Sequence, residues 1–247
     1  MRGFTLLVGV LLTVGSVHAT NFQSEQQTKH ISNFIKQQTK ANISISRSIS
    51  TILSRYPEKV DVVIPAALEL YPDAYEQIIK GAIHAESALA CDVVVAAINT
   101  NIINSSEIVR IAIEADPAYA TEIVNSAGHA DKAALQNIVR VAVRTSEIDN
   151  NKLINETMTS FPQQLVDVLS GAISALPEQV VDIVNSALSL FPGEAESVVQ
   201  TAVSESPAIN NRAIVDAAVK RGMKESNAIE AALAGGAAPE QLANNDL

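Results

Sequence analysis

Apolar residues recur with a period of 15 along most of this chain, from residue 57 to residue 236. When the first residue of each unit is numbered zero, position +7 is Ile, Val or Leu in all twelve units, and position +6 is apolar throughout. Position +10 is Ala except in one unit, where Thr157 replaces it. Together with +3 and +11, these positions trace one face of an α-helix, whereas a strand would alternate with a period of two. The pattern therefore predicts one short helix per unit.

Prolines mark the start of many units and share one register with no insertion or deletion. They are Pro57, Pro72, Pro117, Pro162, Pro177, Pro192 and Pro207. Proline is favoured at the first position of a helix, but a repeated internal proline would break a continuous coiled coil. Asp116 and Ser206, just before two of the prolines, are predicted N-caps. Aromatic residues occupy the same position elsewhere and are expected to plug the joints: Tyr56, Tyr71, Phe161 and Phe191.

The length of the unit decides how successive helices are arranged. A helix of about 11 residues spans about 16 Å, and a link of about four residues reaches at most about 14 Å. The link cannot return to the start of the helix, so the next helix must run antiparallel. The prediction is an all-α fold, an α-solenoid of 15-residue units that pair as 30-residue helical hairpins. This architecture resembles that of tetratricopeptide arrays, although their 34-residue period and signature residues are absent.

The two ends of the array are less regular than its middle. A capping box of Ser24 and Gln27 predicts a leading helix from about Glu25 to Thr39, within the segment 20–41. Residues 42–56 fit the helical register weakly, but their isoleucines also fit a strand, and both readings stay open. In the last two units position +6 shrinks to Ala213 and Ala228, as expected of a cap. The repeat domain is assigned to 42–236, with regular units over 57–236. Residues 237–247 are assigned to a frayed tail, with a further turn beginning at Pro239 as the alternative.

The first 19 residues have the features of a secretory signal peptide. Arg2 precedes an apolar stretch from Phe4 to Val17, which is too short to span a bilayer. Val17-His18-Ala19 precedes the expected cleavage after Ala19. We therefore expect an exported protein, periplasmic or secreted, without a stable membrane anchor.

Composition narrows the range of partners. The chain has 27 Asp and Glu against 17 Lys and Arg, and its formal net charge of −10 becomes −11 when Arg2 is removed. Nucleic acid is an unfavourable partner for an acidic protein, because phosphates repel it. The single cysteine, Cys91, excludes an intramolecular disulfide and leaves an intermolecular one open.

Residue types that perform catalysis are scattered along the sequence. His84 and His129 share position +12 but lie three units apart, so a shared metal site is not expected. No nucleophile elbow or phosphate-binding glycine loop occurs. We expect no enzyme activity, no catalytic residue, no metal and no cofactor.

The hairpin arrangement places a further pattern on the surface, because helices 30 residues apart lie side by side. Position +8 alternates between a basic set on one row of helices and an asparagine set on the other. The basic set is Lys80, Arg110 and Arg140, and the asparagine set is Asn125, Asn155 and Asn185. The first could bind carboxylates, and the second an extended peptide backbone. The stronger interpretation is that both are solvated faces with local pairs such as Glu107–Arg110 at i, i+3. The leading hypothesis is an exported scaffold that binds a protein or peptide, and the alternative is a structural protein that self-associates.

Overall fold

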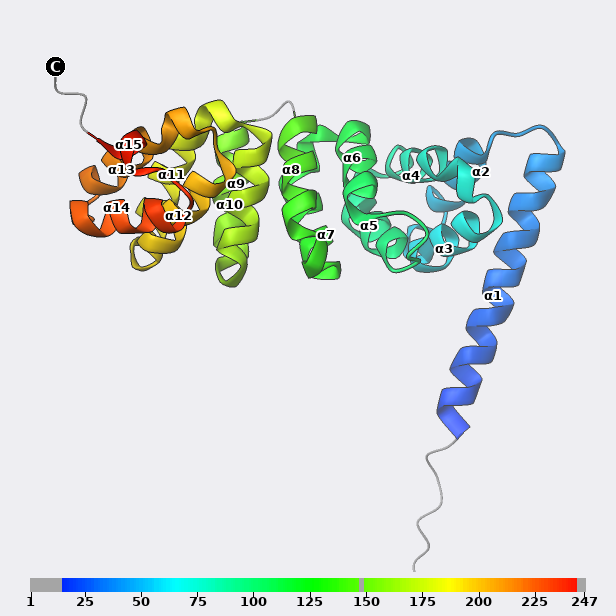
Figure 1. Cartoon of the computed structure of the whole chain (residues 1–247). Coiled ribbons are helices and arrows are strands. Elements are labelled where there is room, and N and C mark those ends of the chain that lie inside the picture. The colour runs from blue at the N-terminus through cyan, green and yellow to red at the C-terminus, as the bar shows by residue number, and fades with distance from the viewer. Residues whose placement is uncertain (1–14, 147–148, 244–247) are drawn as a thin grey trace, which may run out of the picture.

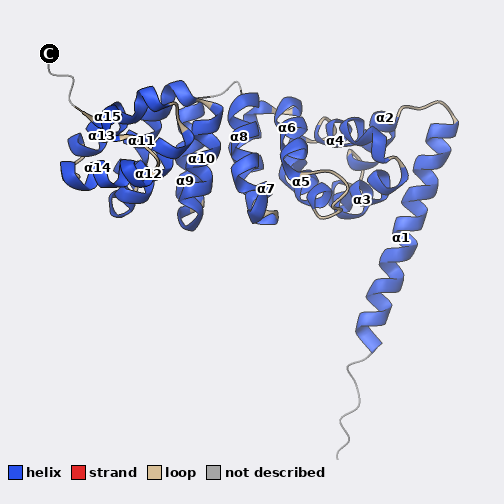
Figure 2. Cartoon of the chain, in the orientation of Figure 1, coloured by secondary structure: helices blue, strands red, loops and turns tan. Residues whose placement is uncertain are grey.

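The chain is entirely helical in the part that the structure describes. The computed structural model describes residues 15–146 and 149–243, with side chains from residue 25 onward, and no strand occurs in these ranges. Figure 2 shows helices joined by short turns. Residues 1–14, which make up most of the expected signal peptide, lie outside the described residues, and the expected cleavage after Ala19 falls inside the first helix.

The α-helices alternate between two rows, and each packs against the next helix of its own row, two further along the chain (Figure 1). The odd row contains α1 (Gly15–Lys40), α3 (Val60–Leu70), α5 (Ala90–Ile98), α7 (Ala120–Ala130), α9 (Asn150–Ser160), α11 (Val180–Leu190) and α13 (Asn211–Lys220). The even row contains α2 (Ile45–Leu53), α4 (Tyr75–Ile83), α6 (Ser105–Ala115), α8 (Leu135–Thr145), α10 (Leu165–Ala175), α12 (Ala195–Glu205) and α14 (Glu225–Ala234). A final turn, α15 (Pro239–Leu242), packs against α13.

Three-residue 3-10 turns join most consecutive helices. They are η1 (Pro57–Lys59), η2 (Pro72–Ala74), η3 (Ser87–Leu89), η4 (Pro117–Tyr119), η5 (Lys132–Ala134), η6 (Pro162–Gln164), η7 (Pro177–Gln179), η8 (Pro192–Glu194) and η9 (Ala208–Asn210). In most proline units the proline begins the 3-10 turn, and the α-helix starts three residues later. The residue before the turn ends the previous helix, as where the Phe191 amide donates to the Ala187 carbonyl at 2.8 Å. The Asp116 side chain caps its turn as predicted, accepting from the Ala118 amide.

The predicted helix face forms the core. Position +7 is buried in eleven of the twelve units, and the exception, Ile229 in the last unit, is partly buried. Thr157, which replaces the alanine at +10, is also fully buried, and its hydroxyl donates to the Leu153 carbonyl at 2.8 Å. Of the aromatic residues before the turns, Phe161 is buried and Tyr71 and Phe191 are partly buried, so these plug joints as expected. Tyr56 is the exception, with 49% of its surface exposed.

The structure resolves the open question about residues 42–56. They contain a helix, α2, whose Ile45, Ile49 and Ile52 are buried, and the Ser44 side chain caps it by accepting from the Arg47 amide. The leading helix α1 is longer than expected at both ends, running from Gly15 to Lys40, and only its C-terminal part lies beside α2 and α3 (Figure 1).

The register does not continue unchanged through Pro207, contrary to the prediction from proline spacing. Pro207 precedes the 3-10 turn η9 instead of beginning it. Each position of the unit, including the buried positions +6 and +7, is therefore occupied by the residue one place later in the chain. Ala213, predicted at the core position +6, is exposed, and Val215 is buried instead. The same shift leaves the Ser206 hydroxyl without a hydrogen-bond partner, so Ser206 is not the predicted cap. The slip gives the core a valine where the unshifted register would have offered an alanine.

The C-terminal segment covers the end of the odd row. The slip buries Asn211, whose side-chain amide donates to Gln241 Oε1 at 2.8 Å. Leu242 is buried as well, and its carbonyl accepts from Arg212 at 2.9 Å. The prediction of a frayed tail is therefore wrong for residues 237–243: the alternative turn at Pro239 is present as α15 and packs against α13.

Glycines allow some helices of the even row to approach backbone to backbone. A Cβ on Gly171 in α10 would lie 2.4 Å from the Gln136 carbonyl oxygen of α8, and one on Gly81 in α4 would lie 2.7 Å from the Ser46 carbonyl oxygen of α2. Real Cβ atoms do not approach a backbone oxygen so closely. These two contacts therefore require glycine.

The register slip predicts that two neighbouring substitutions in α13 differ strongly in how much they lower the unfolding free energy. Val215→Asp buries an unpaired charge and should cost several kcal/mol of unfolding free energy, whereas Ala213→Asp should change it by less than about 1 kcal/mol. Urea denaturation of the two variants measures the difference. The reverse order would show that the register continues unshifted through Pro207.

The close approach at Gly171 predicts that one added methyl group separates α8 from α10. Gly171→Ala should lower the unfolding free energy by about 1–3 kcal/mol, because the clash is with backbone. Gly193→Ala is the matched control, since nothing lies within 4 Å of a Cβ there, and it should be neutral or slightly stabilising. Equal thermal melts of the two variants would contradict the close packing of these helices.

Candidate functional site

The predicted basic set does not form a row of unpaired side chains. Lys80 Nζ lies 2.7 Å from Glu76 Oε1 and 3.1 Å from Glu114 Oε2, so it links α4 to α6. Arg110 pairs with Glu107 at 2.7 Å and also with Glu114. Two of the three predicted cations are thus neutralised within one network of carboxylates.

This network shifts the titration of its members. The pKa of Lys80 is raised because its ammonium donates to Glu76 and Glu114. The pKa of Glu107 is lowered by the hydrogen bond from Arg110. Burial alone would raise the pKa of Glu114, but hydrogen bonds from Lys80 and Arg110 outweigh it and lower that pKa. The network is therefore a structural clamp between α4 and α6 at neutral pH.

Arg140 differs from the other two predicted cations. Its guanidinium donates to the Asn137 side chain at 2.7 Å, and no carboxylate pairs with it in the part of the chain that the structure describes. It borders a hollow of about 520 Å³ between the start of α8 and the loop before α6. Arg140 is the one member of the basic set whose charge remains available.

The side chains of the asparagine set are also not all free to bind a ligand. Asn125 Oδ1 is buried without a hydrogen-bond partner. Asn185 Oδ1 accepts from Arg221 Nε at 3.1 Å, and Arg221 also donates to Ser189 at 2.6 Å. Asn155 is half-buried. The structure places these residues in one row as expected, but two of the three amides cannot receive a ligand without rearrangement.

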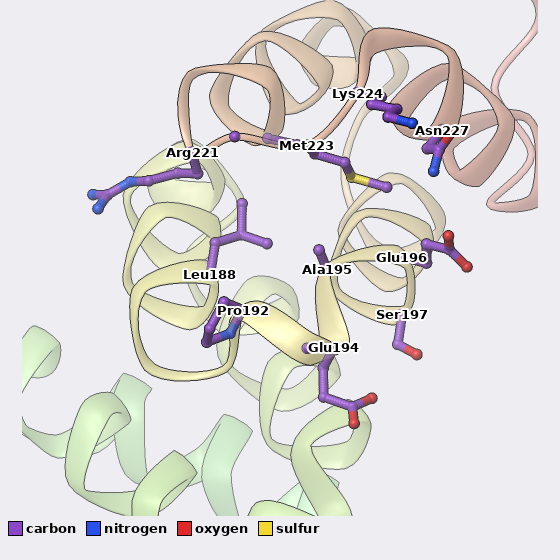
Figure 3. Close-up of a pocket in the computed structure, with 13 residues that line it drawn as sticks. Leu188, Pro192, Glu194, Ala195, Glu196, Ser197, Arg221, Met223, Lys224 and Asn227 are labelled. Carbon is purple, nitrogen blue, oxygen red and sulfur yellow. The ribbon is translucent and has the colours of Figure 1, made fainter.

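The most voluminous of the described hollows lies elsewhere, between η8, the start of α12 and the loop that joins α13 to α14 (Figure 3). Its volume is about 600 Å³. The loop has no proline turn; Gly222 has a φ of +97°, and the Met223 amide donates to the Ala218 carbonyl at 3.1 Å. A left-handed residue after the helix end is favoured when it is glycine. This link lacks the 3-10 turn that joins most other consecutive helices.

The hollow combines an apolar floor with a polar rim. Figure 3 shows Leu188, Pro192 and Met223 around its middle, while the side chain of Arg221 points away. Glu196 and Lys224 lie on the rim, and neither has an ion pair within the described residues. Such a site can take an apolar side chain and leave charged or hydrogen-bonding groups at its edge.

Two smaller hollows adjoin it, both lined by Ser197 and one of them also by Glu194. They have volumes of about 280 and 170 Å³ and extend the concave surface over α10, α12 and α14. Uncharged polar side chains line the larger of the two: Ser170, Gln200, Thr201 and Ser204. All three hollows share Ser197 and are called the Ser197 groove below. Val166, 48% exposed, lies where the two smaller hollows meet.

Sequence reasoning missed this groove because its residues do not recur in the repeat. Ser197 stands at position +5, where other units carry residues such as Gln77 or Asp182. The one available signal was Gly222, a glycine where most other units begin with a proline or a polar residue. A link without the proline turn could have been expected there, but not the hollow beneath it.

The histidines and the cysteine do not add a second site. Cys91 is free and partly exposed. The His129 ring is exposed and lies 4.7 Å from the buried Phe161 ring. No group of three His, Cys, Asp or Glu side chains that could hold a metal ion occurs among the described residues. None of the described helices combines the length and hydropathy needed to cross a bilayer.

Comparison with known proteins does not assign a family. The chain matches no protein family model, and no curated protein or solved structure shows significant similarity to it.

The carboxylate network predicts a pH-dependent contribution to stability. Glu114→Gln should lower the unfolding free energy at pH 7, by no more than about 1 kcal/mol because the side chains are partly exposed. The native pKa of Glu114 is lowered, so its stabilisation is present above the ordinary value of 4.5 and is lost as pH falls through the native pKa. Urea denaturation of wild type and variant should therefore converge in acid. Glu122→Gln, at an exposed position, should show little difference at either pH, and a Glu114→Gln effect that persists in acid would exclude the electrostatic cause.

Proposed function

We propose that this chain is an exported α-solenoid that holds a protein or peptide partner in the Ser197 groove. The solenoid is supported by the two rows, in which each helix packs on its next-but-one neighbour through a shared aliphatic face. Export rests on the sequence pattern of residues 1–19. The binding role rests on the groove itself, a concave surface of three adjoining hollows.

The chemistry of the groove favours an extended peptide segment with at least one apolar side chain. The apolar floor formed by Leu188, Pro192 and Met223 offers a place for that side chain. The hydroxyl and amide groups around Ser197 can bond to the peptide backbone, which always carries both donors and acceptors. Glu196 and Lys224 on the rim can then read the charge of flanking residues. The observation that carries this proposal is the apolar floor beneath an unpaired polar rim.

A bulky side chain in the Ser197 groove should weaken the binding of a peptide while leaving the fold intact. Peptides selected from a random display library against the immobilised chain are the probe, measured by fluorescence anisotropy. Ser197→Trp should weaken their binding by about tenfold or more. Gln77→Trp is the matched control, because Gln77 holds the same +5 position on the even row and lines none of the three hollows.

Two results would contradict the proposal. One is that no peptide is enriched against the chain. The other is that the selected peptides bind Ser197→Trp as tightly as wild type. Circular dichroism melts of both tryptophan variants establish that they are folded.

A further inference from the structure

The register slip at Pro207 creates an apolar projection on the surface. Pro207, Ala208 and Ile209 are consecutive and all exposed, and Ile209 is 89% exposed. At a regular joint the third residue of the turn is usually half-buried, as Tyr119 is in η4. Here the slip gives that role to Asn210 and leaves Ile209 in solvent. Residues 207–209 are called the apolar tip below.

The other end of the molecule carries an apolar slot. The outer sides of α1 and α2 enclose a hollow of about 370 Å³, lined by Ile31, Phe34, Ile52 and Tyr56, with His30 and Arg55 beside them. Phe34 and Tyr56 are both exposed, at 38% and 49%. No further helix of the described chain packs there, because α1 and α2 are the first members of their rows. The hollow is larger than an isoleucine side chain.

Charge is distributed unequally between the tip and the slot. Residues 25–59, around the slot, contain six Lys and Arg against two Glu, whereas residues 177–212, around the tip, contain one Arg against five Asp and Glu. None of the six cations near the slot has an ion pair among the described residues. The tip follows Glu205, and Asn210 donates to the Pro177 carbonyl, which places the tip beside Glu178. Arg55 lines the slot, whereas Glu205 and Glu178 lie beside the tip. Arg212, which follows the tip, is already paired with Asp216 and Glu225.

We propose that the apolar tip of one copy binds in the apolar slot of a second copy. The slot and the tip lie toward opposite ends of the row of helices (Figure 1), so one chain cannot make this contact with itself. An apolar knob flanked by acids complements an apolar slot flanked by cations in both shape and charge. Because the two surfaces differ, the contact either extends into a chain of copies or closes when it is made twice within a dimer.

Sedimentation velocity over a range of concentrations tests this self-association. The full chain is expressed with its own leader so that the host processes it. The wild type should grow beyond a monomer with concentration and less so at high salt, which screens the flanking charges. Ile209→Asp should weaken association by about tenfold or more. Leu233→Asp is the control, since Leu233 is also exposed, at 42%, but belongs to neither surface.

A charge exchange separates this contact from general stickiness. Arg55→Glu and Glu178→Arg should each weaken association. Mixing the two variants should restore it between unlike copies, because both slot–tip contacts there join opposite charges, whereas contacts between like copies remain repulsive. The tip and slot residues changed here are exposed, so melts of these variants should match wild type within about 0.5 kcal/mol.

Three outcomes would overturn the proposal. The wild type could remain a monomer at every concentration and salt. Association could be as strong in Ile209→Asp as in wild type. Finally, a chain that stays monomeric but sediments with phosphatidylglycerol vesicles would assign the basic end to a lipid surface. Peptide binding in the Ser197 groove is measured separately and would be unaffected by any of these results.

Discussion

The residue at position +10 performs two tasks on which the stack depends. Its side chain is small and buried within the two rows, as Ala187 is in α11. In most units its carbonyl also accepts the backbone amide that ends the same helix, four residues later. Packing and helix termination are therefore set at one position. A larger residue would separate the helices and also move the point from which the chain turns, which explains why the only exception, Thr157, is small and bonds to its own helix.

Much of the fold could be predicted from residue spacing because a repeat imposes the same packing on every unit. Position +7 proved buried in nearly every unit, and successive helices fall into two alternating rows. The slip at Pro207 could not be predicted from that spacing, since the proline itself keeps its place. It becomes favourable only when Val215 enters the core and Gln241, far along the chain, meets Asn211.

The candidate site was less predictable than the fold. The sequence placed Lys80, Arg110 and Asn185 correctly in their rows, but a row does not reveal which partner each side chain meets. Glu114 of α6 pairs with Arg110 on its own helix and with Lys80 on α4, and Arg221 at the end of α13 donates to Asn185. The Ser197 groove arises from a loop that departs from the repeat. Function is expected where the units differ, because the residues they share are already committed to packing.

The glycine contacts of the even row also have a mechanical consequence. Where Gly171 rests on the backbone of α8, no flexible side chain separates the two helices, and the same holds for Gly81 against α2. Backbone cannot change rotamer to absorb a displacement, so these pairs should move as rigid blocks. Bending of the rod should then concentrate in the helices between the blocks, where longer side chains form the contacts. The spacing of glycines along one row would in this way determine where an elongated protein yields when it is pulled or bent.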